Sequence, residues 1–240
     1  MNGTQASRIA DLERLLRRIA REHAPSALAS SLSAEDMVIT DSILRLGLDI
    51  EIFTLDTGRM HADTLNLVSA IRERYGYTMR VQQPESEAVT DYVTRFGRDA
   101  FYTGPELRER CCAIRKVAPL GLALRGKRSW ITGQRRAQSA TRSALALQEF
   151  DAARGLAKFN PLAEWSGDEV WSYIGAHRVP YNRLYDQGYR SIGCAPCTRP
   201  TVAGEDVRAG RWWWEQSGAR ECGLHVAGDG RLVRSGETVS

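Results

Sequence analysis

Five cysteines carry the clearest chemical signal in this sequence of 240 residues. Cys111 and Cys112 are adjacent, and Cys194 and Cys197 are separated by two residues. Four thiolates that converge from two such pairs are the ligand set of a tetrahedral zinc ion or an iron–sulfur cluster. An adjacent pair is unusual for zinc, whose ligands usually have about two to four residues between them. Spacing alone leaves three interpretations open: a cluster, a zinc ion or unrelated thiols.

Two cations near the first pair favour the cluster. Arg115 lies four residues after Cys111, and Lys116 lies four residues after Cys112. On an α-helix each cation then shares a face with one thiol. Neighbouring helical side chains diverge by about 100°, which the iron atoms of a bulky cluster accept more readily than one zinc ion. A 4Fe–4S centre with four thiolates is a net anion that these cations would stabilise. The alternative is a solvated helix face.

The fifth cysteine, Cys222, stands alone near the C-terminus, in a glycine-containing region. We predict that residues from about 215 to 240 form a flexible tail that carries this thiol. Thiolate is the reactive form of cysteine, and neighbouring cations lower a thiol's pKa. His225 lies three residues further on and is a candidate helper. Cys222 is therefore either a nucleophile on a movable arm or a thiol without a role.

Several arginines are candidates for binding an anion. Arg208 and Arg211 are three residues apart, so on a helix they would project from one face, and paired guanidinium groups suit a phosphate or a sulfate. Arg135, Arg136 and Arg142 are further candidates, although a single arginine is more often a surface charge. We expect Trp212 to Trp214 to pack against the sheet or a subunit interface rather than to stack on bases.

The composition excludes several functional classes. The formal net charge is only +4, and no basic run or arm indicates nucleic-acid binding. No apolar run reaches the length of a membrane span, and the N-terminus lacks a signal-peptide pattern, so we expect a cytoplasmic protein. Disulfides are rare in that compartment. The length fits one domain over residues 1–240. The oligomeric state stays open, and a homo-oligomer is one alternative.

Hydrophobic periodicity predicts how the chain positions these residues. Helices are expected at 7–23, 36–46, 61–75, 84–96, 111–124 and 167–174. Strands are expected at 27–31, 51–55, 77–81 and 129–132, with 144–150 as a further candidate. This alternation predicts an α/β fold, an open parallel sheet with helices on both faces. Ligands bind beyond the carboxyl ends of such strands, which here are followed by residues 31–36, 56–59 and 133–136.

Eight segments spread in order along most of the chain resemble one family. They are 55–59 (LDTGR), 111–116 (CCAIRK), 132–136 (TGQRR), 158–162 (KFNPL), 179–182 (VPYN), 191–200 (SIGCAPCTRP), 210–215 (GRWWWE) and 221–225 (ECGLH). The chain resembles the cluster-containing assimilatory adenylyl-sulfate reductases. The resemblance implies an adenine nucleotide α-hydrolase-like fold, related to the PP-loop pyrophosphatases. It also implies a 4Fe–4S cluster, one per subunit, on Cys111, Cys112, Cys194 and Cys197.

The resemblance further implies a reaction and its participants. Cys222 would attack the sulfur of adenosine 5′-phosphosulfate (APS), so that AMP leaves and an S-sulfocysteine forms. Thioredoxin, the electron donor, would then release sulfite. Lys116 would link cluster and substrate, and Arg208 and Arg211 would grip the phosphosulfate. The remaining substrate-binding residues that the resemblance implies are Arg142, Ser31 and Leu55.

Two departures from the family and three rival functions remain. Ser33 stands where many relatives have glycine in the first loop, and residues 105–110 lack a histidine that some relatives carry. The first rival is a reductase for the 3′-phosphorylated substrate (PAPS), or for both substrates. The second is an ATP pyrophosphatase of the same fold, whose fuller S-G-G-x-D-S loop is absent here. The third is a zinc-stabilised nucleotide-binding protein.

Overall fold

A six-stranded sheet organises the chain, and the computed structural model describes residues 3–139 and 142–215. The strand order is β3-β2-β1-β4-β6-β5. Neighbouring strands are parallel except for β5, which pairs with β6 in the antiparallel sense at one edge. The strands are β1 (Ser26–Ser30), β2 (Glu51–Leu55), β3 (Arg80–Gln82), β4 (Ser129–Ile131), β5 (Gln148–Asp151) and β6 (Leu156–Phe159).

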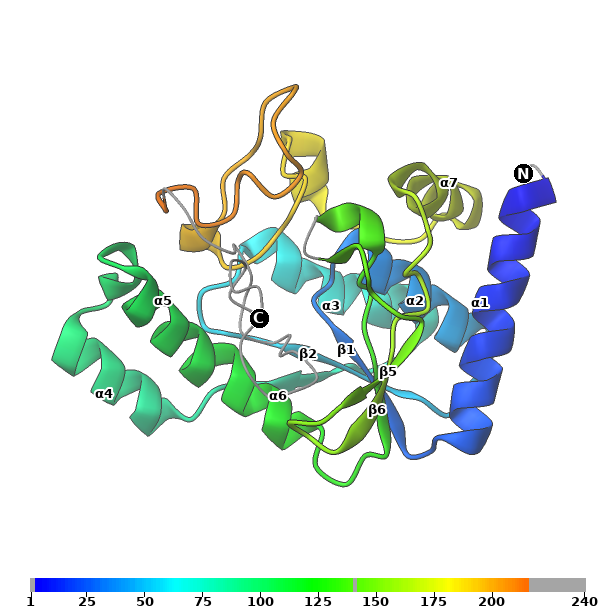
Figure 1. Cartoon of the computed structure of the whole chain (residues 1–240), viewed down its shortest axis with the longest axis horizontal. Helices are drawn as coiled ribbons and strands as arrows, with labels where there is room; N and C mark the ends of the chain where they lie inside the picture. Colours follow the sequence, from blue (N-terminus) through cyan, green and yellow to red (C-terminus); the bar gives the residue numbers. More distant parts are fainter. Residues whose placement is uncertain (1–2, 140–141, 216–240) are drawn as a thin grey trace, which may run out of the picture.

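Both faces of the sheet are covered by helices, because successive strand residues point to opposite sides. In β1, Leu28 belongs to one apolar cluster and its neighbour Ala27 to another. The larger cluster contains residues of α1 (Gly3–Glu22), α2 (Ala34–Arg45), α3 (Ala62–Tyr75) and α7 (Gly167–His177). The smaller cluster contains residues of α6 (Ala118–Ala123), on the opposite side of the strands in Figure 1. The predicted α/β class is confirmed.

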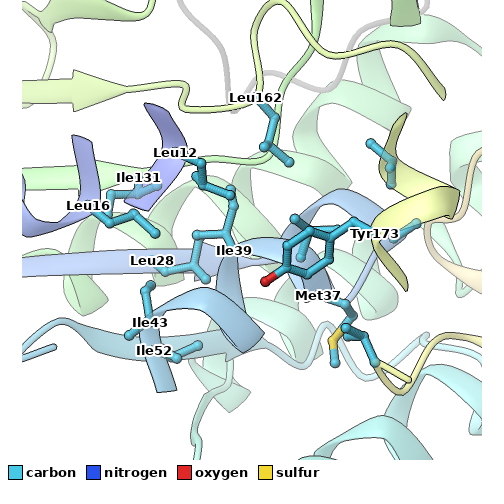
Figure 2. Close-up of a cluster of buried hydrophobic side chains, with 14 of the residues drawn as sticks. Leu12, Leu16, Leu28, Met37, Ile39, Ile43, Ile52, Ile131, Leu162 and Tyr173 are labelled. Carbon is cyan, nitrogen blue, oxygen red and sulfur yellow. The ribbon is translucent and has the colours of Figure 1, made fainter. Parts of the chain in front are cut away.

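The main core lies between the sheet and the first of these helical layers. Figure 2 shows Leu12 and Leu16 of α1 beside Ile39 of α2, with Tyr173 of α7 closing the cluster. Leu16 and Ile39 are fully buried. At roughly 1.5–3 kcal/mol for each buried aliphatic or aromatic side chain, this layer holds α2 firmly against β1. The start of α2 is therefore a rigid platform for the loop that precedes it.

The connection from β3 to β4 forms a long helical arm. It comprises α4 (Ser86–Phe96), η1 (Ala100–Tyr102), α5 (Pro105–Cys112), η2 (Ala113–Val117) and then α6. Pro105 begins α5, a position that tolerates proline because the first helical N–H has no partner within the helix. The expected helix at 111–124 therefore starts six residues earlier. Between α5 and α6 the chain makes one π-helical turn over η2, and such turns are frequent at functional sites.

The remaining segments are short. They include η3 (Arg136–Gln138), η5 (Arg183–Gln187) and η6 (Ala195–Cys197). The expected strand at 144–150 is displaced to β5, and β6 was not among the predicted strands. None of the helices in the described ranges is long and apolar enough to cross a membrane.

Candidate functional site

The strand order reverses between β1 and β4, and the main cavity of the protein lies at this point. The chain proceeds from β1 outward to β2 and β3, then returns to add β4 on the other side of β1. In open parallel sheets the loops diverge at such a switch point and leave a crevice for a ligand. Here a cavity of about 220 Å³ is lined by residues from the loops after β1, β2 and β4.

Asp36 holds the loop after β1 in its shape. Its carboxylate Oδ2 accepts hydrogen bonds from the Ser31 N–H (2.7 Å), the Ser31 hydroxyl (2.6 Å) and the Ser33 hydroxyl (3.2 Å). Burial raises the pKa of Asp36 to about 6, although these donors oppose the shift. Ser33, which replaces the glycine of many relatives, thus serves as one of the donors. Leu32 between them has a left-handed backbone (φ 61°) with a buried side chain, a strained conformation of the kind found at functional sites.

The loop after β4 packs directly on this first loop. A Cβ atom added at Gly133 would collide with the carboxylate of Asp36. This position therefore requires a residue without a side chain. The two loops form one continuous wall of the cavity.

All six residues predicted to bind substrate line this cavity. They come from separate parts of the chain: the loop after β1, the end of β2, the π-helical turn, and the segments after β4 and η6. The six are Ser31, Leu55, Lys116, Arg142, Arg208 and Arg211. The structure thus brings them together, while their individual roles stay predictions.

The arginines at the end of β4 are already paired. The Arg135 Nε and Nη2 groups each lie 2.8 Å from Glu35 Oε1, and Arg135 Nη1 donates to the Trp165 carbonyl at 3.2 Å. Arg136 points away, toward the Leu145 carbonyl (2.8 Å) and a surface glutamate. Arg135 therefore neutralises a buried acid of the cavity wall, and Arg136 does not line the cavity.

Arg190 and Tyr185 are polar cavity residues that were not among the sequence candidates. Arg190 lines the cavity and donates from Nη1 to the Glu205 carbonyl at 3.1 Å. Tyr185 also lines it, and its phenol oxygen accepts a hydrogen bond from the N–H of Ala34, the first residue of α2, at 3.1 Å. Neither residue lies in a spacing that signals ligand binding, and only the approach of η5 to α2 reveals them.

Arg208 and Arg211 do not lie on a helix, so the expectation of a shared helix face is wrong. Residues 207–210 form turns, and Arg211 forms an isolated antiparallel bridge with Thr198. The Arg211 guanidinium lies over the backbone of Gly193, where an added Cβ would be 2.5 Å from Nη2. Its Nη1 donates to the Ile192 carbonyl at 3.1 Å. Both arginines still reach the cavity, but from irregular chain that tertiary contacts hold.

The four predicted metal-ligating cysteines surround a second, smaller cavity next to the first. Cys111 and Cys112 end α5, whereas Cys194 and Cys197 flank the η6 turn. The Cys194 thiol is 3.2 Å from the hydroxyl of Thr57, in the loop after β2. None of the four forms a disulfide. Segments more than eighty positions apart in the sequence therefore meet here, and Lys116 lines both cavities.

Trp212 forms a wall of this second cavity. It is buried in one cluster with Phe101, Cys112, Cys194 and Cys197, and its backbone N–H donates to the Cys197 carbonyl at 3.2 Å. Trp212 is thus a packing residue, but it packs against the cysteines and not against the sheet, which was one of the two expected surfaces.

Burial in the second cavity raises the pKa of its thiols and so disfavours free thiolates. Burial raises the pKa of Cys197 to about 12, with Lys116 and Arg211 acting in the opposite direction. Burial likewise raises the pKa of Cys111, and Arg115 opposes that shift. Burial therefore favours the neutral thiols here, and a cation bound among them would favour the thiolates.

Unpaired hydrogen-bond donors lie in the wall of this second cavity and next to it. Among the described residues, Arg108 Nη1 and Trp212 Nε1 in the wall have no partner, and neither do Arg211 Nε of the main cavity and Trp214 Nε1, whose side chain packs against the cysteine cluster. All four are donors, and buried polar groups without partners are rare in native proteins. The described ranges hold no group of three or more His, Cys, Asp or Glu side chains set to hold one metal ion. The remaining predicted residue, the nucleophile Cys222, lies outside the described residues, as does the predicted tail beyond Glu215.

Comparisons with known proteins agree with this geometry. The phosphoadenosine phosphosulfate reductase domain model matches residues 25–200. The adenosine 5′-phosphosulfate reductase of Burkholderia cepacia is 52% identical over 221 residues, which cover 92% of this chain and 88% of that protein. The protein of the same name from Neisseria meningitidis serogroup A is 53% identical over 229 residues, 93% of each chain.

Two solved structures show the same fold. A phosphoadenylyl-sulfate (PAPS) reductase from Candida auris, in a phosphate complex, superposes with a TM-score of 0.68 at 27% identity, covering 78% of this chain and 90% of that one. The FMN adenylyltransferase of Candida glabrata with ATP gives a TM-score of 0.55 at 14% identity, covering 84% of this chain and 67% of that one. The second likeness concerns the fold alone. The expected adenine nucleotide α-hydrolase-like fold is confirmed.

Proposed function

We propose, from the premise that this chain belongs to the phosphoadenosine phosphosulfate reductase family, that it reduces APS to sulfite and AMP in assimilatory sulfate reduction. The observation that carries the proposal is the meeting of two distant cysteine pairs beside a cation-lined cavity at the switch point of the sheet. Relatives named for this activity share more than half of their residues with the chain over about nine tenths of its length. We place the reaction in the cytoplasm.

The charge of the main cavity suits a phosphosulfate. Its acids are Glu35 and Asp36, and Glu35 is already paired with Arg135. A surplus of positive charge remains for the two negative charges of APS, and arginine forks bind phosphate and sulfate oxygens in pairs. The cations that line the cavity are Lys116, Arg135, Arg142, Arg190, Arg208 and Arg211.

The second cavity fits a 4Fe–4S cluster on Cys111, Cys112, Cys194 and Cys197. Three buried thiols, the half-buried thiol of Cys111 and the unpaired N–H donors of Arg108 and Trp212 suit an anionic, sulfur-rich group. A cluster binds each thiolate through a different iron, so its ligands lie farther apart than those of a single zinc ion. When bound, the cluster would supply a fixed charge beside Lys116, which in turn faces the substrate cavity.

The chemistry then requires one nucleophile and one external reductant. The Cys222 thiolate attacks the sulfur of APS, the sulfur–oxygen bond to AMP breaks, and AMP leaves with the electron pair. A thioredoxin thiolate next attacks the sulfur of Cys222, sulfite leaves, and the second thioredoxin thiol resolves the mixed disulfide. Arg142, Arg208 and Arg211 neutralise the charge on the phosphosulfate and on the leaving AMP.

The covalent connection of Cys222 to the site is short. Glu215 forms a hydrogen-bonded ion pair with Arg108, a residue in the wall of the cysteine cavity. Cys222 follows Glu215 by seven positions, and a chain of that length spans at most about 25 Å. This length supports the proposal that Cys222 attacks a substrate bound in the main cavity.

An intact-mass measurement tests the proposed reaction. Protein incubated with APS in the absence of thioredoxin should gain the mass of one sulfonate, and Cys222→Ser should gain none. Thioredoxin should then remove the adduct from the unmodified chain and release sulfite. An adduct that maps to another cysteine would refute the assignment of the nucleophile.

Substrate choice is tested by comparing rates with the two nucleotides. We expect APS to be turned over with the higher kcat/KM. A strong preference for the 3′-phosphorylated substrate would instead align this chain with the activity for which its Candida auris neighbour is named.

Metal analysis tests the cofactor. Protein purified without oxygen should be brown and contain about four irons and four sulfides per chain, as a cubane cluster requires. Cys194→Ala should lose the colour and the iron. Colourless protein that contains one zinc would contradict the cluster.

A further inference from the structure

Arg108 is a buried cation in the wall of the cysteine cavity, at a position that the sequence did not single out. It lies on α5, three residues before Cys111, and its side chain is only 3% exposed. Its guanidinium stacks on the indole of Trp212, with 4.8 Å between Cζ and the ring centroid. The side chain is thus fixed in place in the wall of the cavity that the four cysteines line.

The nitrogens of this guanidinium have different surroundings. Nε donates to Glu215 Oε1 at 2.6 Å, and Nη2 lies 3.6 Å from Glu109 Oε1. Nη1 is buried and has no hydrogen-bond partner within the described residues. The neighbouring cavity cations differ, because Arg59 pairs with Asp99 at 2.5 Å and Arg115 donates to the Thr57 carbonyl at 2.7 Å.

A buried cationic N–H without an acceptor is costly, so its place beside four thiols indicates which acceptor it serves. We propose that Arg108 Nη1 donates a charge-assisted hydrogen bond to a sulfur atom of the metal centre that the four cysteines hold. Glu215 and Trp212 orient the guanidinium for this contact. The inference rests on the proposed function, since it presumes the cluster.

Such a contact has consequences for the metal centre itself. A cation and an N–H···S bond draw electron density from the sulfur, which lowers the iron–sulfur stretching frequency. The same bond is an extra contact that holds the anionic cluster in its site and so opposes the release of iron. The expected signatures are therefore spectroscopic and do not depend on turnover.

The test uses Arg108→Lys in protein purified without oxygen. Lysine keeps the positive charge near Glu215 but lacks the second arm of the guanidinium fork. We expect unchanged iron content, a shift of the Fe–S stretching bands to higher frequency in the resonance Raman spectrum, and about tenfold faster loss of iron to a chelator, the usual size of such an outer-shell effect. The matched control is Arg110→Lys on the same helix, an exposed residue that does not line the cavity, which should leave both readouts unchanged.

A second variant provides the test if Arg108→Lys does not fold. Arg108→Met combined with Glu215→Met removes both charges together, so that neither is left buried alone. It should show the same band shift and the same faster loss of iron. Bands and iron loss identical to those of the unmodified chain in a folded variant would overturn the role of Arg108. Unmodified protein without iron would instead overturn the cofactor proposal, so the two failures are distinguishable.

Discussion

Asp36 joins the two loops that form the wall of the substrate cavity. Three donors from the loop after β1 converge on one of its carboxylate oxygens, while its other oxygen faces Gly133 in the loop after β4. Its burial raises the pKa from 3.8 to about 6. A group whose pKa is higher in the folded state stabilises the fold fully below the unfolded pKa. That contribution is lost as the pH rises through the folded pKa.

Asp36→Asn should therefore change the pH dependence of stability. Asparagine resembles the protonated acid in shape and keeps an oxygen that accepts the three hydrogen bonds. The melting temperature of the variant relative to the unmodified chain should increase as the pH rises from about 4 to about 6, and stay level above that range. Thermal unfolding followed by circular dichroism at about pH 5 and about pH 8 measures the difference. A gap between the two proteins that is independent of pH would contradict the assignment.

Sequence reasoning at this scale found the residue types but not their partners. It identified the four cysteines, Lys116 and the arginines from spacing and resemblance. It could not find that Arg135 is neutralised by Glu35, because the two lie 100 positions apart and meet only through the packing of two loops. Arg108 was missed for the same reason, since its importance comes from Glu215 and Trp212.

At the scale of elements, the turn that precedes Cys194 positions Arg211, an arginine of the main cavity. The backbone of Gly193 is covered by the guanidinium of Arg211, which leaves no room for a side chain. The segment from Gly188 to Gly193 therefore supports the main cavity, while the η6 turn that follows it supports the cysteine cavity.

Gly193→Ala should displace the Arg211 guanidinium and weaken substrate binding. We expect KM for APS to rise about tenfold, which corresponds to the loss of one hydrogen bond to a charged group, with a smaller change in kcat. Steady-state kinetics measure this split. Gly175→Ala is the matched control, because a Cβ in that part of α7 meets nothing within 4 Å. Equal kinetics for both variants would show that the contact is dispensable.

Most elements followed from hydrophobic patterning, and the exceptions have physical causes. The strands β1, β2 and β4 are short apolar runs bounded by turns, so the pattern locates them. β6 contains Lys158, which is buried by a 2.8 Å ion pair with Glu149 of β5 and by the ring of Trp130. A lysine inside a strand hides the apolar pattern. The π-helical turn after Cys112 has no periodic signature of its own, because a single turn is too short to show a repeat.

At the scale of the whole molecule, α1 stabilises the site from a distance. Leu12, Leu16 and Ile19 are buried against the layer that also contains α2 and α7. None of these α1 side chains lines either cavity. The helix thus contributes to the free energy of unfolding without touching the proposed substrate.

Leu16→Ala should lower the free energy of unfolding by about 2–5 kcal/mol, as expected for truncating a fully buried leucine. Urea denaturation measures this change, and kcat should stay the same at temperatures where the variant is folded. Arg17→Ala, at the neighbouring exposed position, should change stability by less than about 0.5 kcal/mol. A large loss of kcat in folded Leu16→Ala would mean that α1 also shapes the cavity.

The location of the site could be predicted at this scale, because the carboxyl ends of parallel strands meet at one edge. From the sequence alone, that rule predicts that residues 31–36 and 133–136 lie close together. The irregular segment from Tyr185 to Arg211 could not be placed in this way. It has no periodic pattern, and its position depends on tertiary contacts such as that of Tyr185 with Ala34.

The two cavities have a common partition. Lys116 lines both cavities. The backbone of Gly193, which precedes Cys194, also packs against the Arg211 guanidinium. A relative that lacks the four thiols would thus also lose the support of two cations that line the main cavity. We expect the two cysteine pairs and these cations to be present together or absent together in related sequences.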